Sequence, residues 1–187
     1  MPLRKRHIAV FAAVALACAT SARAQSRYGL GRPATPAEIA GWNIDTDREG
    51  HNLPPGSGTV SHGQEVFDQQ CAACHGAKGE GGVGDQLAGG QGTLATPKPV
   101  RTVGSYWPYA PTLFDYIRRA MPQNAPQSLS NDDVYAVSAY ILHLNGLLPA
   151  GATLDARTLA AIKMPNRSMF TGDTRPDVKN SGCVTGC

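Results

Sequence analysis

The chain has 187 residues and a formal net charge of +3, with 17 Lys and Arg against 14 Asp and Glu. This length allows one domain with extensions. The cations do not cluster into the basic face that nucleic-acid binding needs, so we expect no nucleic-acid partner. No segment after the first 24 residues is apolar and long enough to cross a bilayer, so we also expect no membrane span.

The first 24 residues have the three parts of a secretory signal peptide. A basic head, MPLRKRH, precedes the apolar run IAVFAAVALACAT, and a small-residue site ends at Ala24. A lipoprotein signal at Cys18 is the weaker alternative, because Ala15 stands where a large aliphatic residue is usual. Cleavage near Ala24 would remove four cations and leave a mature chain with 13 Lys and Arg against 14 Asp and Glu. We therefore expect an exported, soluble protein.

Residues 25–59 are predicted to form an N-terminal extension without a core of its own. They are rich in Pro and Gly, and they contain one short helical piece near residues 36–40. A helix is predicted to follow, because Ser61 and Gln64 form a capping box. In that helix Gly63, Phe67 and Cys71 recur every four residues and share one face, so a second helix can approach closely at the glycine.

The stretch CAACH, residues 71–75, raises three chemical alternatives. A zinc site usually has four Cys or His ligands in two pairs, and a thiol-redox motif lies between a strand and a helix. Neither context is present here, and a plain Cys71–Cys74 disulfide would not need the histidine. Cys-x-x-Cys-His is the attachment motif for c-type haem, in which both thiols form thioethers and His75 binds the iron. We therefore expect one covalently attached haem c, with Phe67 packed beside its edge.

Residues 76–99 are glycine-rich and nearly free of bulky side chains, so we expect no regular element there. In a haem protein such a loop wraps the histidine side of the haem. One of its backbone carbonyls is expected to accept a hydrogen bond from the second ring nitrogen of His75. The sequence leaves open which carbonyl this is.

Two further helices are predicted after this loop. The first covers residues 113–120, with Thr112 and Asp115 as its capping pattern, and Pro122 stops it. The second is capped by Ser130 with Asp133 and ends at Asn145-Gly146. Its Tyr140 can reach the helix before CAACH, so the two helices are expected to cross at Gly63.

A six-coordinate haem needs a second axial ligand, and methionine is the main candidate. Met121 lies in a proline-bracketed loop, which presents the thioether at low entropic cost. Met164 is the main alternative, and Met169 is a weaker candidate than either. His62 and His143 would give bis-histidine ligation, but each is more typical of a surface position.

Other candidates concern the haem periphery and the C-terminus. Arg118 precedes Met121 and can pair with a propionate, although a cation at a helix C-terminus is equally explained by the helix dipole. The full set for propionate binding or haem packing is Phe67, Arg101, Tyr106, Trp107 and Arg118. Cys183 and Cys187 are expected to form a local disulfide in an exported tail.

Residues 60–145 resemble class I cytochromes c. The resemblance is carried by CAACH after Gly63-x-x-x-Phe67, by Ala120-Met121-Pro122, and by the capped helix with Tyr140. It implies an all-α fold around one covalent haem with His75 and Met121 as axial ligands. With the other features, it divides the chain into a signal peptide (1–24), an N-terminal extension (25–59), a cytochrome c domain (60–146) and a C-terminal extension (147–187).

A longer resemblance covers nearly the whole mature chain. GRPATPAEIAGWNID, LPPGSG, VGSYWPYAPTLFDYIRRAMP, APQSLSNDDVYAVSAYILHLNG and KMPNR are similar to the cytochrome subunit of periplasmic sulfane or sulfite dehydrogenases, the SoxD-like cytochromes. This resemblance implies a periplasmic electron-transfer subunit rather than a catalyst on its own. Its expected partners are a molybdenum-cofactor dehydrogenase subunit and a downstream acceptor such as another cytochrome. The single haem motif excludes a two-haem relay within these residues.

Three other functions remain as alternatives. The chain can be a general periplasmic carrier for another dehydrogenase, a haem enzyme such as a thiosulfate-converting cytochrome, or a sensor with a displaceable Met121. An enzyme or sensor would need an open or labile distal site on the haem.

Overall fold

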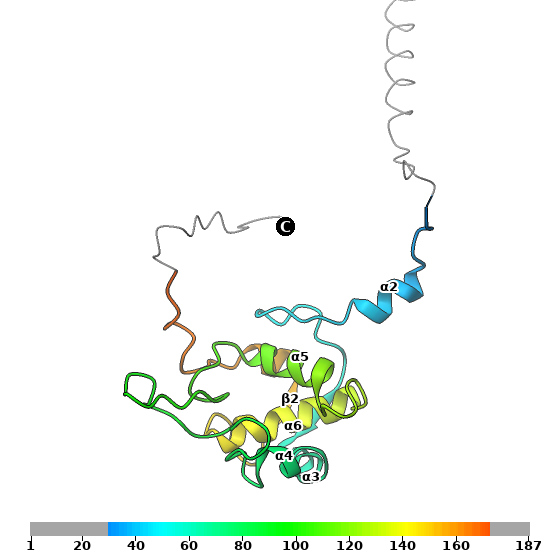
Figure 1. Ribbon diagram of the computed structural model, residues 1–187. Coiled ribbons are helices and arrows are strands. Elements are labelled where there is room, and N and C mark those ends of the chain that lie inside the picture. The colour runs from blue at the N-terminus through cyan, green and yellow to red at the C-terminus, as the bar shows by residue number, and fades with distance from the viewer. Residues whose placement is uncertain (1–29, 173–187) are drawn as a thin grey trace, which may run out of the picture. The chain divides into compact units, whose positions relative to one another are not determined.

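The computed structural model describes residues 30–172, and the chain divides into two compact units, 1–41 and 42–187 (Figure 1). In the described part of the first unit, Thr35 precedes helix α2 (Pro36–Trp42), which matches the short helix expected near residues 36–40. The Thr35 hydroxyl accepts the amide proton of Glu38, and the Glu38 carboxylate accepts that of Thr35 at 2.8 Å. The expected signal peptide and the Cys183–Cys187 pair lie outside the described residues.

The regular elements in the described part of the second unit are mostly helices. Its elements are β1 (Ser57–Thr59), α3 (Val60–Gln70), α4 (Ala72–His75), α5 (Ala110–Ala120), α6 (Asn131–Leu144), β2 (Thr153–Asp155) and α7 (Ala156–Ala160). All the expected helices are present. The two short strands are a feature that the sequence pattern does not predict.

Helices α3 and α6 cross at Gly63, as expected. A Cβ at Gly63 would overlap the carbonyl oxygen of Ala136 and lie 2.9 Å from the Cβ of Tyr140. Four residues further along α3, the Phe67 ring is fully buried and lies 5.2 Å from the Tyr140 ring, centroid to centroid. The absence of a side chain at residue 63 therefore sets how closely α6 approaches the helix that leads into CAACH.

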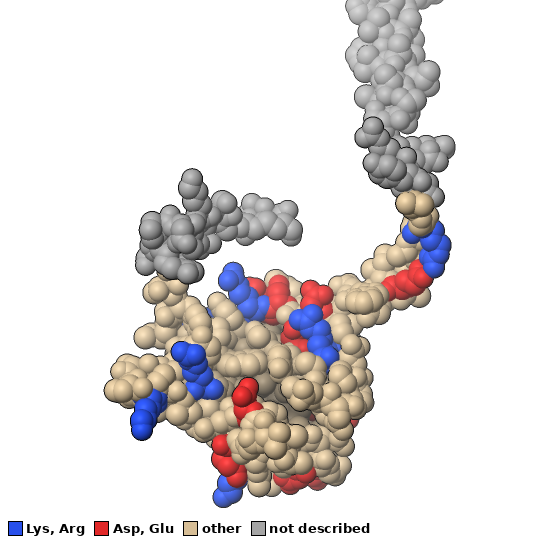
Figure 2. All heavy atoms as spheres, in the orientation of Figure 1, with Lys and Arg blue, Asp and Glu red and all other residues tan. Residues whose placement is uncertain are grey.

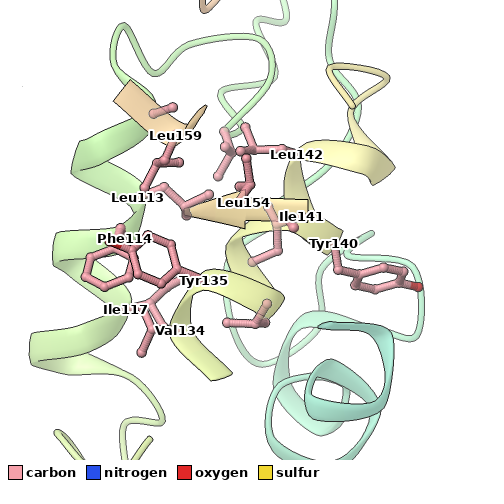
Figure 3. Close-up of a cluster of buried hydrophobic side chains, with 14 of the residues drawn as sticks. Leu113, Phe114, Ile117, Val134, Tyr135, Tyr140, Ile141, Leu142, Leu154 and Leu159 are labelled. Atoms are coloured by element: carbon pink, nitrogen blue, oxygen red, sulfur yellow. The ribbon is translucent and has the colours of Figure 1, made fainter. Parts of the chain in front are cut away.

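The apolar core lies between α3, α5, α6 and the elements that follow α6 (Figure 3). The rings of Phe114 on α5 and Tyr135 on α6 are 4.4 Å apart. Leu154 of β2 and Leu159 of α7 are fully buried in the same cluster. Burying a leucine side chain stabilises a fold by roughly 1.5–3 kcal/mol, so residues beyond 146 contribute substantially to this core.

The two strands join the segments on either side of the central helices. β1 and β2 pair antiparallel, with Gly58 opposite Leu154. Gly58 lies so close to α6 that a Cβ there would be 2.6 Å from the Cβ of Ala136. The Tyr135 hydroxyl donates to the Pro54 carbonyl at 2.8 Å. Residues 54–59 and 153–155 are thereby fixed to α6, while the expected boundaries at residues 59 and 146 stay predictions.

The cap of α3 differs from the expected capping box. Thr59, not Ser61, is the N-cap, and its hydroxyl accepts the amide proton of His62 at 3.1 Å. The reason is the sheet, which the sequence did not reveal. Pairing with β2 holds Thr59 in the extended conformation, so the helix begins directly after the strand.

The start of α5 also differs, whereas both ends of α6 are as expected. α5 begins at Ala110 without a side-chain cap, because the Asp115 carboxylate instead accepts the Thr46 amide at 2.8 Å and pairs with Arg119. The Ser130 hydroxyl accepts the amide proton of Asp133 at 3.1 Å. α6 then ends before Asn145.

Replacing Gly63 with alanine tests the close crossing. The added methyl group overlaps backbone rather than a flexible side chain, so we expect Gly63→Ala to lower the free energy of unfolding by about 3 kcal/mol. Gly151→Ala is the matched control, because a Cβ there meets nothing within 4 Å. Urea denaturation of both haem-loaded variants measures the difference. Equal stabilities would contradict this account of the crossing.

Candidate functional site

The CAACH residues lie at a break between two helices. Cys71 terminates α3 with its amide bonded to the Phe67 carbonyl at 2.8 Å. α4 then makes a single turn, in which the His75 amide donates to the Cys71 carbonyl at 3.0 Å. Both cysteines are free thiols, with Cys71 half-buried and Cys74 exposed. The structure therefore presents two unpaired thiols and an imidazole on adjacent turns.

The surroundings of Cys71 do not favour thiol catalysis. Burial raises the pKa of its thiol to about 11, and the neighbouring Cys74 adds to this effect. Catalytic and redox cysteines need the opposite, a pKa lowered by nearby positive charge or a helix N-terminus.

A backbone carbonyl fixes the orientation of His75. The Nδ1 atom of His75 lies 2.6 Å from the carbonyl oxygen of Asp85. Because a carbonyl can only accept, the ring proton belongs on Nδ1, and Nε2 keeps a free lone pair for a metal. The sequence predicted such a carbonyl in the glycine-rich loop, and the structure identifies it as that of Asp85.

The residue before Asp85 packs against the same ring. A Cβ at Gly84 would lie 2.9 Å from Cε1 and 3.0 Å from Nδ1 of His75. The Gly84 amide also donates to the Cys74 carbonyl at 2.8 Å. The loop thus lies against one face of the imidazole and leaves no room for a side chain there.

Residues 76–99, all of them described, contain no helix or strand, as expected. Backbone hydrogen bonds hold this loop around CAACH. The Gly81 amide donates to the His75 carbonyl at 2.7 Å, and the Gly79 carbonyl accepts from Leu87 and Ala88. Gly79 has a φ of +70°, a conformation that other residues adopt only with strain.

The three methionine candidates have different environments. Met121 is the C-cap of α5 and is half-buried against the edge of the core. Met164 is only 3% exposed and belongs to the apolar core, which is the usual role of a methionine. Met169 is 71% exposed. Met121 is therefore the candidate that is neither enclosed in the core nor largely exposed.

Both histidines considered as axial ligands are bonded to other protein groups. His62 Nε2 lies 2.7 Å from a carboxylate oxygen of Asp133, and this hydrogen bond raises the pKa of His62. His143 Nδ1 lies 2.8 Å from the Leu148 carbonyl oxygen. The His62 contact occupies Nε2 and holds α3 to α6. The His143 contact holds the end of α6 to the segment after it and, like the Asp85 contact of His75, leaves Nε2 available.

The propionate candidates fall into two places. The Arg101 guanidinium lies over the Tyr106 ring at 5.4 Å, and the next residue, Trp107, packs edge-on against Tyr116 at 5.9 Å. Arg118 instead donates to the Ile44 carbonyl at 3.1 Å and borders a small hollow beside Ile44. One loop thus carries Arg101, Tyr106 and Trp107. The Arg118 guanidinium instead forms its hydrogen bond with the segment before β1.

Charged residues are scattered on the face drawn in Figure 2. Lys and Arg form separate spots there, and several spots touch Asp or Glu. One exposed group combines Asp47, Glu49 and His51, whose potential ligand atoms lie within 4.8 Å of one another. Its His51–Asp47 contact is an ordinary surface ion pair, and we assign the group no metal.

These features fit covalent haem attachment. Two free thiols precede an imidazole with an available Nε2, and a carbonyl sets the tautomer of that imidazole. Zinc would need further Cys or His ligands, and the structure places none beside CAACH among the described residues.

Comparison with known proteins identifies the relatives of the chain. Residues 60–145 match the cytochrome c family. A chain in the crystal structure of the sulfane dehydrogenase SoxCD from Paracoccus pantotrophus is 40% identical, with a TM-score of 0.76 over 85% of this chain and 83% of that one. A thiosulfate dehydrogenase from Stutzerimonas stutzeri (strain A1501) is 33% identical over 91 residues, which are 47% of this chain. The match spans only 28% of that relative.

These findings confirm the expected class I cytochrome c fold and the covalent haem c cofactor. The roles of individual residues stay predictions. No helix among the described residues is long and apolar enough to cross a membrane.

The attachment role of Cys71 and Cys74 can be tested directly. We expect the double variant Cys71→Ser/Cys74→Ser to lose all haem on a denaturing gel, because no thioether would remain. The matched control is Cys183→Ser/Cys187→Ser, which should keep its haem. Haem staining together with intact mass measures both outcomes. Covalent haem in the first variant, or its loss from the second, would contradict the assignment.

Proposed function

The chain belongs to the cytochrome c family, and we propose that it is the electron-accepting subunit of a periplasmic, molybdenum-dependent dehydrogenase of sulfur compounds. The observation that carries this proposal is the likeness to a chain of the SoxCD sulfane dehydrogenase. That likeness covers 85% of this chain and therefore extends well beyond the family match at residues 60–145. A general carrier would not need to share with that chain the segments that flank residues 60–145.

We assign the haem contacts as follows. Cys71 and Cys74 would form the thioethers, and His75 would bind the iron through Nε2, which the Asp85 carbonyl leaves available. Met121 would supply the second protein ligand, which its half-buried place at the end of α5 supports. Arg101, Tyr106 and Trp107 are the candidates for the propionates, because they lie together and Arg101 has no carboxylate partner among the described residues.

Two protein ligands leave no open position for a substrate, which favours a carrier. Haem c supplies the one-electron chemistry, and the protein sets the potential and the docking geometry. Oxidation of sulfite, as one example, consumes water and yields sulfate, two protons and two electrons. The oxidation itself takes place at the molybdenum subunit. The two electrons reach the single haem one at a time, so a downstream acceptor such as another cytochrome must reoxidise this chain between the first and the second transfer.

We further propose that residues 1–24 are a signal peptide and that the mature chain works in the periplasm. The tripartite pattern of that segment supports this. The proposed docking surface for the catalytic subunit consists of residues 42–59 and 147–172. Their support is the β1–β2 pairing, which holds both segments on α6 in a defined position.

A second candidate function is thiosulfate oxidation by this chain itself. The 33% identity to a thiosulfate dehydrogenase favours it, although the match covers 28% of that protein. It would require a distal ligand that leaves the iron during turnover. Met121 would then have to be displaceable.

Rapid-mixing spectroscopy separates the two functions. We expect a molybdenum-dependent sulfite or sulfane dehydrogenase with its substrate to reduce the oxidised cytochrome, with two cytochromes reduced per two-electron oxidation. Substrate without the dehydrogenase is the control and should give no reduction. Reduction by thiosulfate alone would favour the second function. No reduction with any such dehydrogenase would contradict the first.

A further inference from the structure

Asn145 lies where α6 meets the loop that follows CAACH. Its side chain is 7% exposed, and all its hydrogen-bonding capacity is used. The carboxamide donates to the carbonyl oxygens of Ile141 at 2.8 Å and Leu87 at 3.0 Å. Its oxygen accepts from the Gly89 amide at 3.2 Å and from the Gln91 side chain at 3.3 Å. One side chain thus connects the end of α6 to three positions in the loop.

The loop residues that Asn145 holds are those next to the His75 contact. At one end of residues 84–89, the Gly84 amide is hydrogen-bonded to Cys74. At the other end, Leu87 and Gly89 are hydrogen-bonded to the Asn145 side chain. Asp85, whose carbonyl accepts from His75 Nδ1 at 2.6 Å, lies between the two ties. The position of that carbonyl therefore depends on both anchors.

The carboxamide is enclosed as well as bonded. A Cβ at Gly104 would lie 2.5 Å from its Cγ, so the backbone of residue 104 packs directly against it. A second bond reinforces the loop, because the Thr102 hydroxyl donates to the Gly89 carbonyl at 2.6 Å. Asn145 consequently has little freedom to rotate, and its geometry is transmitted to the loop.

We propose that Asn145 is a positioning residue for the axial histidine. By holding Leu87 and Gly89, it keeps the Asp85 carbonyl against His75 Nδ1. A hydrogen bond accepted from Nδ1–H makes the other nitrogen a stronger donor, which favours the oxidised metal. Loosening the loop weakens that bond and raises the reduction potential. This inference rests on the proposed role of His75 as an iron ligand but not on the proposed partner.

Asn145→Ala is the test, and Tyr135→Phe is its control. Tyr135 is fully buried on the same helix, and its hydroxyl donates one hydrogen bond of 2.8 Å to the Pro54 carbonyl, away from the residues that contact His75 and from Arg101, Tyr106 and Trp107. We expect both variants to lose stability. Only Asn145→Ala should raise the reduction potential, shift the His75 ring resonances of the oxidised protein, and speed amide exchange at Leu87 and Ala88 by about tenfold or more.

An unchanged potential in Asn145→Ala, or the same shift in both variants, would show that Asn145 has only a structural role. If Asn145→Ala does not fold, Asn145→Ser retains a small polar group, and the same measurements and criteria apply to it. The proton NMR spectrum of the oxidised wild type separately tests whether His75 is an iron ligand, because ring protons without large paramagnetic shifts would exclude it. The potential is measured without a dehydrogenase, so failure of the proposed partnership leaves this result interpretable.

Discussion

The hydrogen bond between His75 Nδ1 and the Asp85 carbonyl is the contact on which the site depends. It gives the imidazole one tautomer and one orientation, and it requires a loop backbone that reaches back to the ring. Glycine makes this reach possible, since a side chain at Gly84 would collide with the ring. The loop is in turn tied to α6 through Asn145, and α6 crosses α3 at Gly63. The helix crossing and the histidine geometry are therefore parts of one connected structure.

The segments outside residues 60–145 complete the same unit. Leu154 and Leu159 bury their side chains in the core, and β2 pairs with the strand that precedes α3. The buried Asn166 side chain binds the Tyr106 carbonyl, so the residues after α7 also hold the loop of the propionate candidates. A cytochrome that only diffuses between partners has little use for such additions. In an electron-transfer subunit they can hold a fixed docking surface, which is why we connect them with the proposed dehydrogenase partner.

Local signals in the sequence predicted the helices and the carbonyl contact of His75. Ser130 with Asp133, the Asn145-Gly146 stop and the Gly63–Phe67 spacing each act within a few residues, and the structure confirms them. The wrong predictions concern residues whose partners are distant in sequence. The N-cap of α3 is Thr59 instead of Ser61, because the strand that ends at Thr59 pairs with residues 153–155. Asp115 accepts a hydrogen bond from Thr46 instead of capping α5. Asn145 was recognised only as a helix end, because backbone atoms more than 50 residues away reveal its role.

We propose a six-coordinate carrier with His75 and Met121 as ligands of the haem iron. The most direct test is the visible and near-infrared spectrum of the oxidised protein for the wild type, Met121→Ala and Met164→Ala. We expect a methionine–iron charge-transfer band in the wild type and in Met164→Ala, and its loss in Met121→Ala. Met164→Ala should differ only in stability, since Met164 belongs to the core. A band that survives in Met121→Ala, or a high-spin wild type without any band, would contradict the account.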